Sequence, residues 1–193
     1  KDNVVLGSSE RANIFTSFSI NGNNDTLEKG YTWVHNIDEL QEMNENTNGW
    51  YALRNSIDAN ATADGFSPIG NGSNPFTGRF DGLGYSIFGL NVKEDTDAAG
   101  LFGFATYAHI KNFTLNGGSI SGGKYVGAAV GSGSGGVIEN ITNTASVSGI
   151  GTGEGGIGGI VGHAGDTTMS GLKNIGTIKG DANSENVGGI VGY

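Results

Sequence analysis

The chain has 193 residues, enough for one domain with a continuous core, and 37 of them are glycine, 2 are proline and none is cysteine. These counts exclude a collagen-like repeat, a disulfide-stapled scaffold and thiolate chemistry. The formal net charge of −9 argues against nucleic acid and anionic lipid as partners, and we also expect no insertion into a lipid bilayer.

The amino terminus, KDNVVLGSSER at 1–11, lacks the charged, apolar and small-residue order of a signal peptide. No window of about 18 apolar residues is present either. Hydrophobic residues still make up 36% of the chain, which predicts a folded protein rather than a flexible linker. We therefore expect either a cytosolic protein or a mature or excised piece of a longer one.

The first half of the chain is irregular. IDELQEM at 37–43 places Ile37, Leu40 and Met43 on one helical face with acidic residues early, which predicts one or two helical turns ended by NTNG at 46–49. YALRNSID at 51–58 predicts a strand, and FTGRFDGLGYSIFGL at 76–90 predicts two strand-like runs around an Asp-Gly turn. Residues 1–97 are therefore interpreted as irregular coils of a solenoid with a helix-containing insertion.

A glycine-rich phrase recurs in the second half at intervals of about 30 residues, within the range typical of solenoids. Its copies are AAGLFG at 98, VGAAVG at 126, IGGIVG at 157 and VGGIVG at 187. Paired glycines weaken an isolated strand, so the phrase indicates close approach of stacked backbones. The expected inward column is Leu101, Ala129, Ile160 and Ile190, flanked by Phe102, Val130, Val161 and Val191.

A second phrase runs in step with the first. Its copies are IFGLNV at 87, IKNFTL at 110, IENITN at 138 and LKNIGT at 172. Its first and fourth positions can both face inward only if the chain bends between them, and asparagine tolerates the left-handed conformation that such a bend needs. Asn112, Asn140 and Asn174 are therefore predicted to form a corner ladder with stacked amides, with Gly89 in the same place in the first copy.

Short Thr, Ser and Val segments between the two phrases supply a third side. Three strands and three turns per coil of roughly 30 residues predict an all-β fold, a right-handed parallel β-helix. The whole chain, 1–193, is interpreted as a single β-helix segment of a larger protein, with glycine-rich repeats over 98–193. Ile110, Ile138 and Leu172 are expected to stack in one file.

Few residues suggest site chemistry. His35, His109 and His163 lie far apart and none belongs to an HExxH pair, so we expect no zincin site. Alternate oxygen-bearing residues in a run from 58 to 64 have a calcium-like spacing but lack the glycine and distal glutamate of an EF-hand, and turn formation explains them adequately. That run comprises Asp58, Asn60, Thr62 and Asp64.

Carbohydrate chemistry is the remaining alternative. Polysaccharide lyases and glycosidases on β-helices need clustered carboxylates, whereas the acids of this chain are scattered. Trp33, Trp50 and Tyr51 could form a sugar-stacking platform, but sealing an insertion or a coil end is the preferred interpretation.

The ordered series WVHNIDELQEM, GWYALRNSID, GFSPIG, FTGRFDGLGYSIFGL, AGLFG and IKNFTL, followed by VGAAVG-type repeats, resembles the GLUG-type repeat region of large bacterial surface proteins. It is similar above all to filamentous haemagglutinin-like exoproteins of two-partner secretion, and also to repeat regions flanking some bacterial IgA1 peptidases. The NPNL and NPNGI phrases of the exoprotein secretion domain do not occur here. The resemblance covers 31–193 and supplies no catalytic or ligand residues.

What the resemblance implies is a non-enzymatic β-helical stalk and contact surface of a secreted adhesin on the Gram-negative cell surface. The implied partners are a host-cell surface protein or glycan, another bacterial cell, and an outer-membrane transporter for the parent chain, with no cofactor or metal. Contacts are expected from loops 91–98, 149–156 and 180–186. A carbohydrate-active β-helix and an accessory region of a surface IgA1-type peptidase remain as alternatives.

Overall fold

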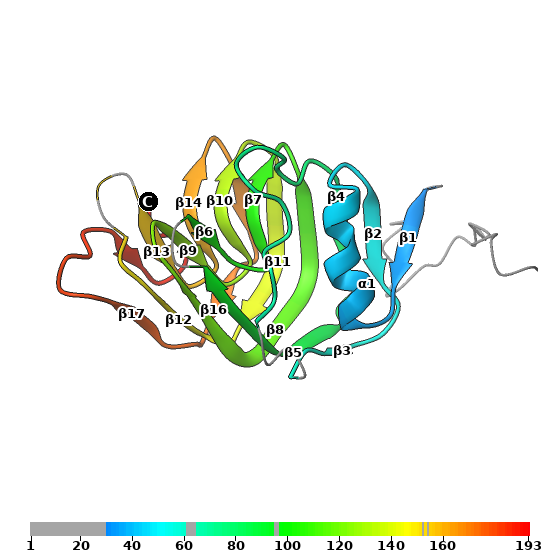
Figure 1. The fold of residues 1–193 in the computed structure, drawn as a ribbon, viewed down its shortest axis with the longest axis horizontal. Coiled ribbons are helices and arrows are strands. Elements are labelled where there is room, and N and C mark those ends of the chain that lie inside the picture. The colour runs from blue at the N-terminus through cyan, green and yellow to red at the C-terminus, as the bar shows by residue number, and fades with distance from the viewer. Residues whose placement is uncertain (1–29, 61–64, 95–96, 152, 154) are drawn as a thin grey trace, which may run out of the picture.

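The structure is a computed structural model that describes residues 30–60, 65–94, 97–151, 153 and 155–193. Its strands follow one another along the long axis of the molecule, with helix α1 towards the N-terminal end (Figure 1). Every strand ladder in the described part of the chain is parallel, and successive coils pair with each other. The predicted parallel β-helix is confirmed.

Sheet A forms two sides of the coil. The first side runs in the order β1 (Tyr31–Val34), β2 (Trp50–Leu53), β4 (Arg79–Asp81), β8 (His109–Gly122), β11 (Val137–Asn143) and β15 (Thr168–Ser170), with β16 (Lys173–Asn174) also on β11. The second side contains β3 (Ile57–Asp58), β5 (Ser86–Glu94), the later part of β8, β12 (Ser146–Gly149) and β17 (Ile178–Gly180). The expected Thr, Ser and Val side is therefore present.

Sheets B and C close the coil. Sheet B has the order β14 (Val161–Gly165), β10 (Val130–Ser134) and β7 (Phe102–Thr106). Sheet C has the order β18 (Val187–Gly188), β13 (Gly156–Gly158), β9 (Tyr125–Gly127) and β6 (Ala98–Ala99). Both sheets are built from the glycine phrase, so this phrase spans two sides and the corner between them. The expected three strands per coil are therefore corrected to four, as in β10, β11, β12 and β13.

The predicted glycine-phrase column is confirmed. Val130 pairs with Phe102 on one side and with Val161 on the other, and Val161 bridges to Val191. Leu101, Ala129 and Ile160 are fully buried beside them, while Ile190 is partly buried on the last coil. Apolar side chains on both flanks of the bend thus face the core.

The short helix is also confirmed. Helix α1 (Ile37–Gln41) continues into the 3₁₀ turn η1 (Glu42–Glu45), and Asn36 caps it by accepting the Glu39 N–H at 2.9 Å. Leu40 and Met43 are fully buried and Ile37 packs against the core, as their spacing predicts. In the described part of the chain no helix is long and apolar enough to span a bilayer.

A chain of aromatic rings fills the core between the irregular coils and the repeats. Phe80 contacts Phe102 and Phe113, each at a ring-centre distance of 5.4 Å, and Phe76 contacts Phe102 at 4.7 Å. All four rings are buried. This packing joins 76–90 to the later coils, so the irregular first half is part of the same solenoid core.

The expected file of Ile110, Ile138 and Leu172 is wrong at its last member. Ile138 pairs with Ile110 and with Met169, whereas Lys173 pairs with Thr142, which sets Leu172 level with Ile141. The last copy is therefore shifted by three residues relative to the coil before it. Gly171, with φ of 62°, supplies the left-handed bend there.

The first copy is shifted as well. Ile87 pairs with Leu115, while Phe80 is the residue level with Ile110. Leu90, the residue after Gly89, pairs with Gly118. Gly89 therefore lies in the second corner of the coil and not in the Asn112 corner. The phrase IFGLNV thus belongs to a different side of the coil from IKNFTL. The two phrases look alike in the sequence because both sides carry alternating aliphatic residues.

Candidate functional site

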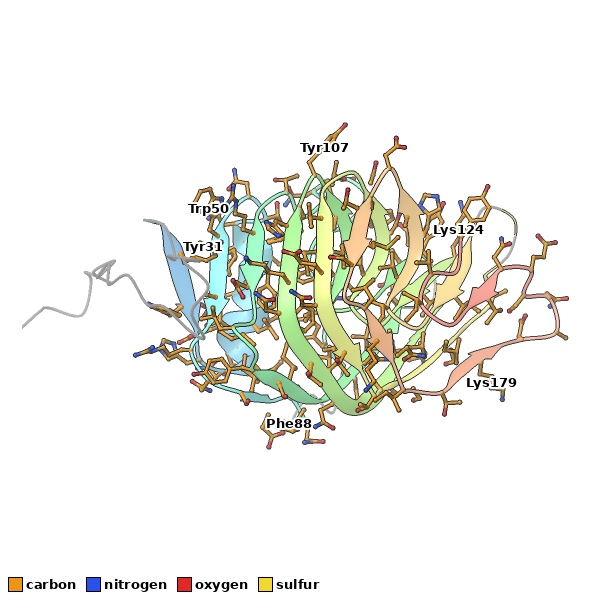
Figure 2. The ribbon with its side chains drawn as sticks, turned by 180° about the vertical axis from the view of Figure 1, so that it is seen from behind. Tyr31, Trp50, Phe88, Tyr107, Lys124 and Lys179 are labelled. Carbon is orange, nitrogen blue, oxygen red and sulfur yellow. The ribbon has the colours of Figure 1, made fainter. Side chains whose placement is uncertain are left out.

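The outward surface of sheet A, near its N-terminal end, holds the aromatic and basic side chains of several coils. Residues of four successive strands are in register there, with Trp50 paired to Tyr31 and to Arg79, and Arg79 paired to His109. Figure 2 shows Tyr31 and Trp50 on neighbouring strands of this surface. We call the set Tyr31, Trp33, Trp50, Arg54, Arg79, His109, Lys111 and Glu139 the sheet A face.

Trp50 is held between its two neighbours. The Tyr31 ring centre lies 5.6 Å from that of Trp50, and the Arg79 guanidinium carbon lies 4.3 Å from the Trp50 ring on the next coil. Burial raises the pKa of Tyr31, the charge of Asp81 acts in the same direction, and Arg79, which hydrogen-bonds the phenol, opposes both. The stacked ring fixes the plane of an exposed guanidinium.

A second arginine is stacked in the same way. The guanidinium carbon of Arg54 lies 5.1 Å from the ring of Trp33. Both arginines are exposed, and neither has an ion-pair partner among the residues that the structure describes. Apart from the bond that Arg79 makes to the Tyr31 phenol, their fork-shaped donors are therefore open to a carboxylate from outside the chain.

The remaining charged or titratable residues of the face have partners in neighbouring strands. Lys111 Nζ lies 3.6 Å from Asp81 Oδ2, and His109 Nε2 lies 2.9 Å from Glu139 Oε1. Asp81 is 4% exposed, and its Oδ1 accepts the Leu83 N–H at 2.9 Å. The acid nearest to Arg79 in the strand is thus engaged elsewhere.

The structure brings together two members of the predicted corner ladder. Asn140 Nδ2 donates to Asn112 Oδ1 at 3.1 Å, and Asn112 Nδ2 donates to Asp81 Oδ1 at 3.0 Å. Asn174 lies in another ladder, where it accepts from Asn143 Nδ2 at 3.0 Å. The prediction of one column with three asparagines is therefore corrected at Asn174, because each of these coils bends twice within a few residues.

The proposed aromatic platform is only partly present. Trp33 and Trp50 lie on the outward face, but each has an arginine over its ring. Tyr51 points inward, is 7% exposed and donates its hydroxyl to Asn46 O at 2.8 Å. Alternation along β2 puts Trp50 and Tyr51 on opposite sides, so a platform that uses both is excluded.

The histidines and the calcium-like run have local explanations. His35 contacts Glu39 at 2.9 Å, and His163 lies between the rings of Tyr125 and Tyr193 at 5.4 Å from each. Asp58 Oδ1 accepts from the backbone and side chain of Asn60, which lowers the pKa of Asp58. Thr62 and Asp64 lie outside the described residues, and within those residues no His, Asp and Glu side chains gather into a metal site.

The arginine and tryptophan pairs were not expected from the sequence. Trp50, Arg79 and His109 follow one another at roughly one coil period, which is the signal that would have aligned them. The period in this half is carried by strands without the glycine phrase. The arginine and tryptophan pairs therefore belong to a column of outward-facing side chains, whereas the repeated phrases mark columns of inward-facing side chains.

The predicted contact loops are described only in part. The loop 180–186 is an Asx-type turn in which Asp181 Oδ1 accepts from Asn183 N at 2.8 Å, and Glu185 Oε2 accepts from Gly153 N at 3.2 Å. The loops 91–98 and 149–156 include residues outside the described part of the chain, 95–96 and 152 and 154.

Fold and face together define a parallel β-helical repeat protein with an aromatic and basic outward surface. No family model matches the chain. It is 35% identical over 154 residues to halomucin of Haloquadratum walsbyi, covering 72% of this chain and 2% of halomucin. It is 33% identical over 164 residues to an immunoglobulin A1 protease of Streptococcus sanguinis, covering 79% of this chain and 8% of that protease.

The chain therefore spans less than a tenth of the length of either relative. Among solved structures, it is similar to a Bacteroides ovatus chain provisionally named an immunoglobulin A1 protease. That likeness has a TM-score of 0.42 and 18% sequence identity, and it covers 86% of this chain and 74% of the other.

Proposed function

We propose that this chain is a β-helical stalk and contact region of a secreted surface protein, with an adhesive and non-enzymatic role. The relatives that support this proposal are a halomucin and an immunoglobulin A1 protease, of which the chain matches a small part. The further assignment to a filamentous haemagglutinin-like exoprotein, exported through an outer-membrane transporter of a Gram-negative cell, is supported by the GLUG-type resemblance.

The observation that carries the proposal is the pair of tryptophan-stacked arginines on the sheet A face. Arg54 and Arg79 are exposed cations in a chain of formal net charge −9, and no acid among the described residues neutralises either one. Surfaces of this kind favour carboxylate-bearing partners. The proposed partner is a host-cell surface protein or glycan, or another cell, that presents such carboxylates.

Binding of the purified chain to host cells tests this role. The double variant Arg54→Gln and Arg79→Gln is expected to bind about tenfold more weakly, since stacked arginines are frequent binding hot spots. Lys179→Gln is the charge-matched control for each arginine variant taken singly, because it removes one positive charge from β17, which Figure 2 shows far from Trp50. Unchanged binding by the double variant, or hydrolysis of a glycan by the chain, would overturn the proposal.

A second candidate is an accessory repeat region of an IgA1-type peptidase. The 33% identity to the Streptococcus sanguinis protease favours it. The test is the complete gene: a peptidase domain with an HExxH motif in the same reading frame, together with slower IgA1 cleavage after deletion of 30–193, would support it. An HExxH-free reading frame would remove it.

A further inference from the structure

Three complete Asn-x-Ser/Thr triplets fall within the described residues, and they differ in what the asparagine amide does. They are 71–73 (Asn-Gly-Ser), 112–114 (Asn-Phe-Thr) and 140–142 (Asn-Ile-Thr). Such triplets are acceptors of N-linked sugar in exported proteins when they lie on accessible surface loops. Two further triplets, at 24–26 and 60–62, lie wholly or partly outside the described residues.

Two of the triplets are unsuitable in the folded chain. Asn112 lies within β8 and Asn140 within β11, both with positive φ, at 61° and 54°. The Nδ2 of Asn140 donates to Asn112, and the Nδ2 of Asn112 donates to Asp81. Attaching sugar at either nitrogen would break the ladder and open a paired strand.

Asn71 has the opposite surroundings. Residues 71–74 are all exposed and close a turn in which Asn71 N donates to Asn74 O at 3.0 Å. Asn71 Oδ1 accepts from Ser73 N at 3.0 Å and from Asn74 N at 2.9 Å. These bonds orient the carboxamide through its oxygen, while its Nδ2 donates to no residue in the described part of the chain.

The turn is anchored on both sides by the solenoid. Ile69 bridges to Phe102 and Phe76 bridges to Ala105, so the turn projects from the edge of sheet B beside β7. Thr47 Oγ1 also contacts Asn74 Oδ1 at 3.0 Å. A fixed and protruding acceptor turn is accessible after folding, and it lies on a different sheet from the sheet A face.

We propose that Asn71 is an N-glycan acceptor, a modification that rests on the surface location proposed above. The donor is an oligosaccharide linked through phosphate to a polyisoprenoid lipid, and the catalyst is an oligosaccharyltransferase. Asn71 Nδ2 forms a bond to C1 of the first sugar as the C1–O bond to the lipid phosphate breaks. The phosphate leaves with the electron pair, and the amide loses one proton to a base of the transferase.

The test incubates the folded chain with a transferase of Asn-x-Ser/Thr specificity and its lipid-linked donor. Intact mass spectrometry is expected to show addition of a glycan, and site-localising fragmentation is expected to place it on Asn71. Asn71→Gln and Ser73→Ala abolish this modification. Thr114→Ala and Thr142→Ala, which remove the triplets of Asn112 and Asn140 but keep the asparagine ladder, leave Asn71 occupancy unchanged.

A synthetic peptide of residues 66–78 separates sequence from fold. Modification of both peptide and folded chain at Asn71 supports the proposal. An unmodified Asn71 in the folded chain overturns it, whether or not the peptide is accepted, and so does preferential modification of Asn112 or Asn140. Cell binding plays no part in this measurement. A failure of the adhesive proposal would be seen in cell binding, and a failure of the glycan proposal would be seen in the mass spectrum.

Discussion

Asn140 donates its side-chain amide to Oδ1 of Asn112 on the preceding coil, 3.1 Å away, while both residues hold a left-handed backbone conformation. The bend lets the aliphatic residues on either side of it, such as Ile138 and Ile141, both enter the core. Asp81 ends the ladder by accepting from Asn112 at 3.0 Å. One residue type thus serves the backbone bend and the bond between coils.

Replacing Asn140 separates these two roles. Asn140→Ala loses the amide bond and places a Cβ without local hydrogen bonding in the left-handed region, so a loss of about 2 kcal/mol in the free energy of unfolding is expected. Asn140→Gly keeps the bend and loses only the bond, at about 1 kcal/mol. Urea denaturation measures both. Equal losses for Ala and Gly would contradict the assigned role of the backbone.

The corners show why sequence reasoning succeeded in part. The glycine phrase set the register of Phe102, Val130 and Val161 correctly, because its close backbone contacts allow no slippage. The asparagine phrase did not, because Asn140 and Asn143 lie three residues apart in one coil and each can be aligned with Asn174. In the structure Gly171 takes the left-handed position level with Asn140, and Asn174 pairs with Asn143.

The site was less accessible to prediction. Trp33, Trp50 and Tyr51 stand out by residue type. Only the alternation of side chains along each strand, whose phase the sequence does not show here, separates the inward Tyr51 from the outward tryptophans. The partners Arg54 and Arg79 come from strands without a repeated phrase. Outward columns are under no packing constraint, so the sequence carries little periodic signal for them.

Two glycines of the repeated phrase are expected to respond differently to substitution by alanine. A Cβ on Gly158 would meet the backbone oxygens of Val161 and Ile190 and the nitrogen of Gly192, whereas a Cβ on Gly189 would meet nothing within 4 Å. Gly158→Ala should therefore cost roughly 2–3 kcal/mol through forced backbone movement. Gly189→Ala should stay within about 0.5 kcal/mol of the parent. Thermal unfolding followed by circular dichroism compares them, and similar melting temperatures would refute the close-contact explanation.

Helix α1 and the 3₁₀ turn η1 hold the loop segment 67–70 through two side-chain amides. Gln41 exchanges two bonds with the backbone of Ser67, at 2.9 and 3.0 Å. Asn44 accepts from Gly70 N at 2.9 Å and donates to Pro68 O at 3.2 Å. The two amides thus satisfy backbone groups of Ser67, Pro68 and Gly70.

Burial predicts which amide contributes more to stability. Gly70 is buried, so Asn44→Leu leaves its backbone N–H without a partner or water, and the free energy of unfolding should fall by about 1–3 kcal/mol. Ser67 is exposed, so water replaces Gln41 in the variant Gln41→Leu and the loss is smaller. Asn44→Asp keeps the acceptor for Gly70 and is the intermediate control. Guanidinium denaturation gives the order, and a larger loss for Gln41→Leu would contradict it.

Tyr51 predicts a loss of stability at alkaline pH. Burial raises its pKa above the ordinary value of 10.0, and the negative charge of Glu45 acts in the same direction. The folded state therefore disfavours the tyrosinate, so this contribution to stability is complete below pH 10.0 and is lost as pH rises through the folded-state pKa. Tyr51→Phe should make the alkaline fall in unfolding free energy shallower.

The same variant has a cost at neutral pH. Tyr51→Phe removes the bond to Asn46 O, which should lower the unfolding free energy there by about 0.5–1.5 kcal/mol. The curves of variant and parent are thus expected to converge as pH rises from about 8 to 11 in urea titrations. Tyr107→Phe, at a phenol that is 79% exposed, controls for removal of a hydroxyl. Parallel curves for Tyr51→Phe and the parent would show that the Tyr51 phenol ionises equally readily in both states.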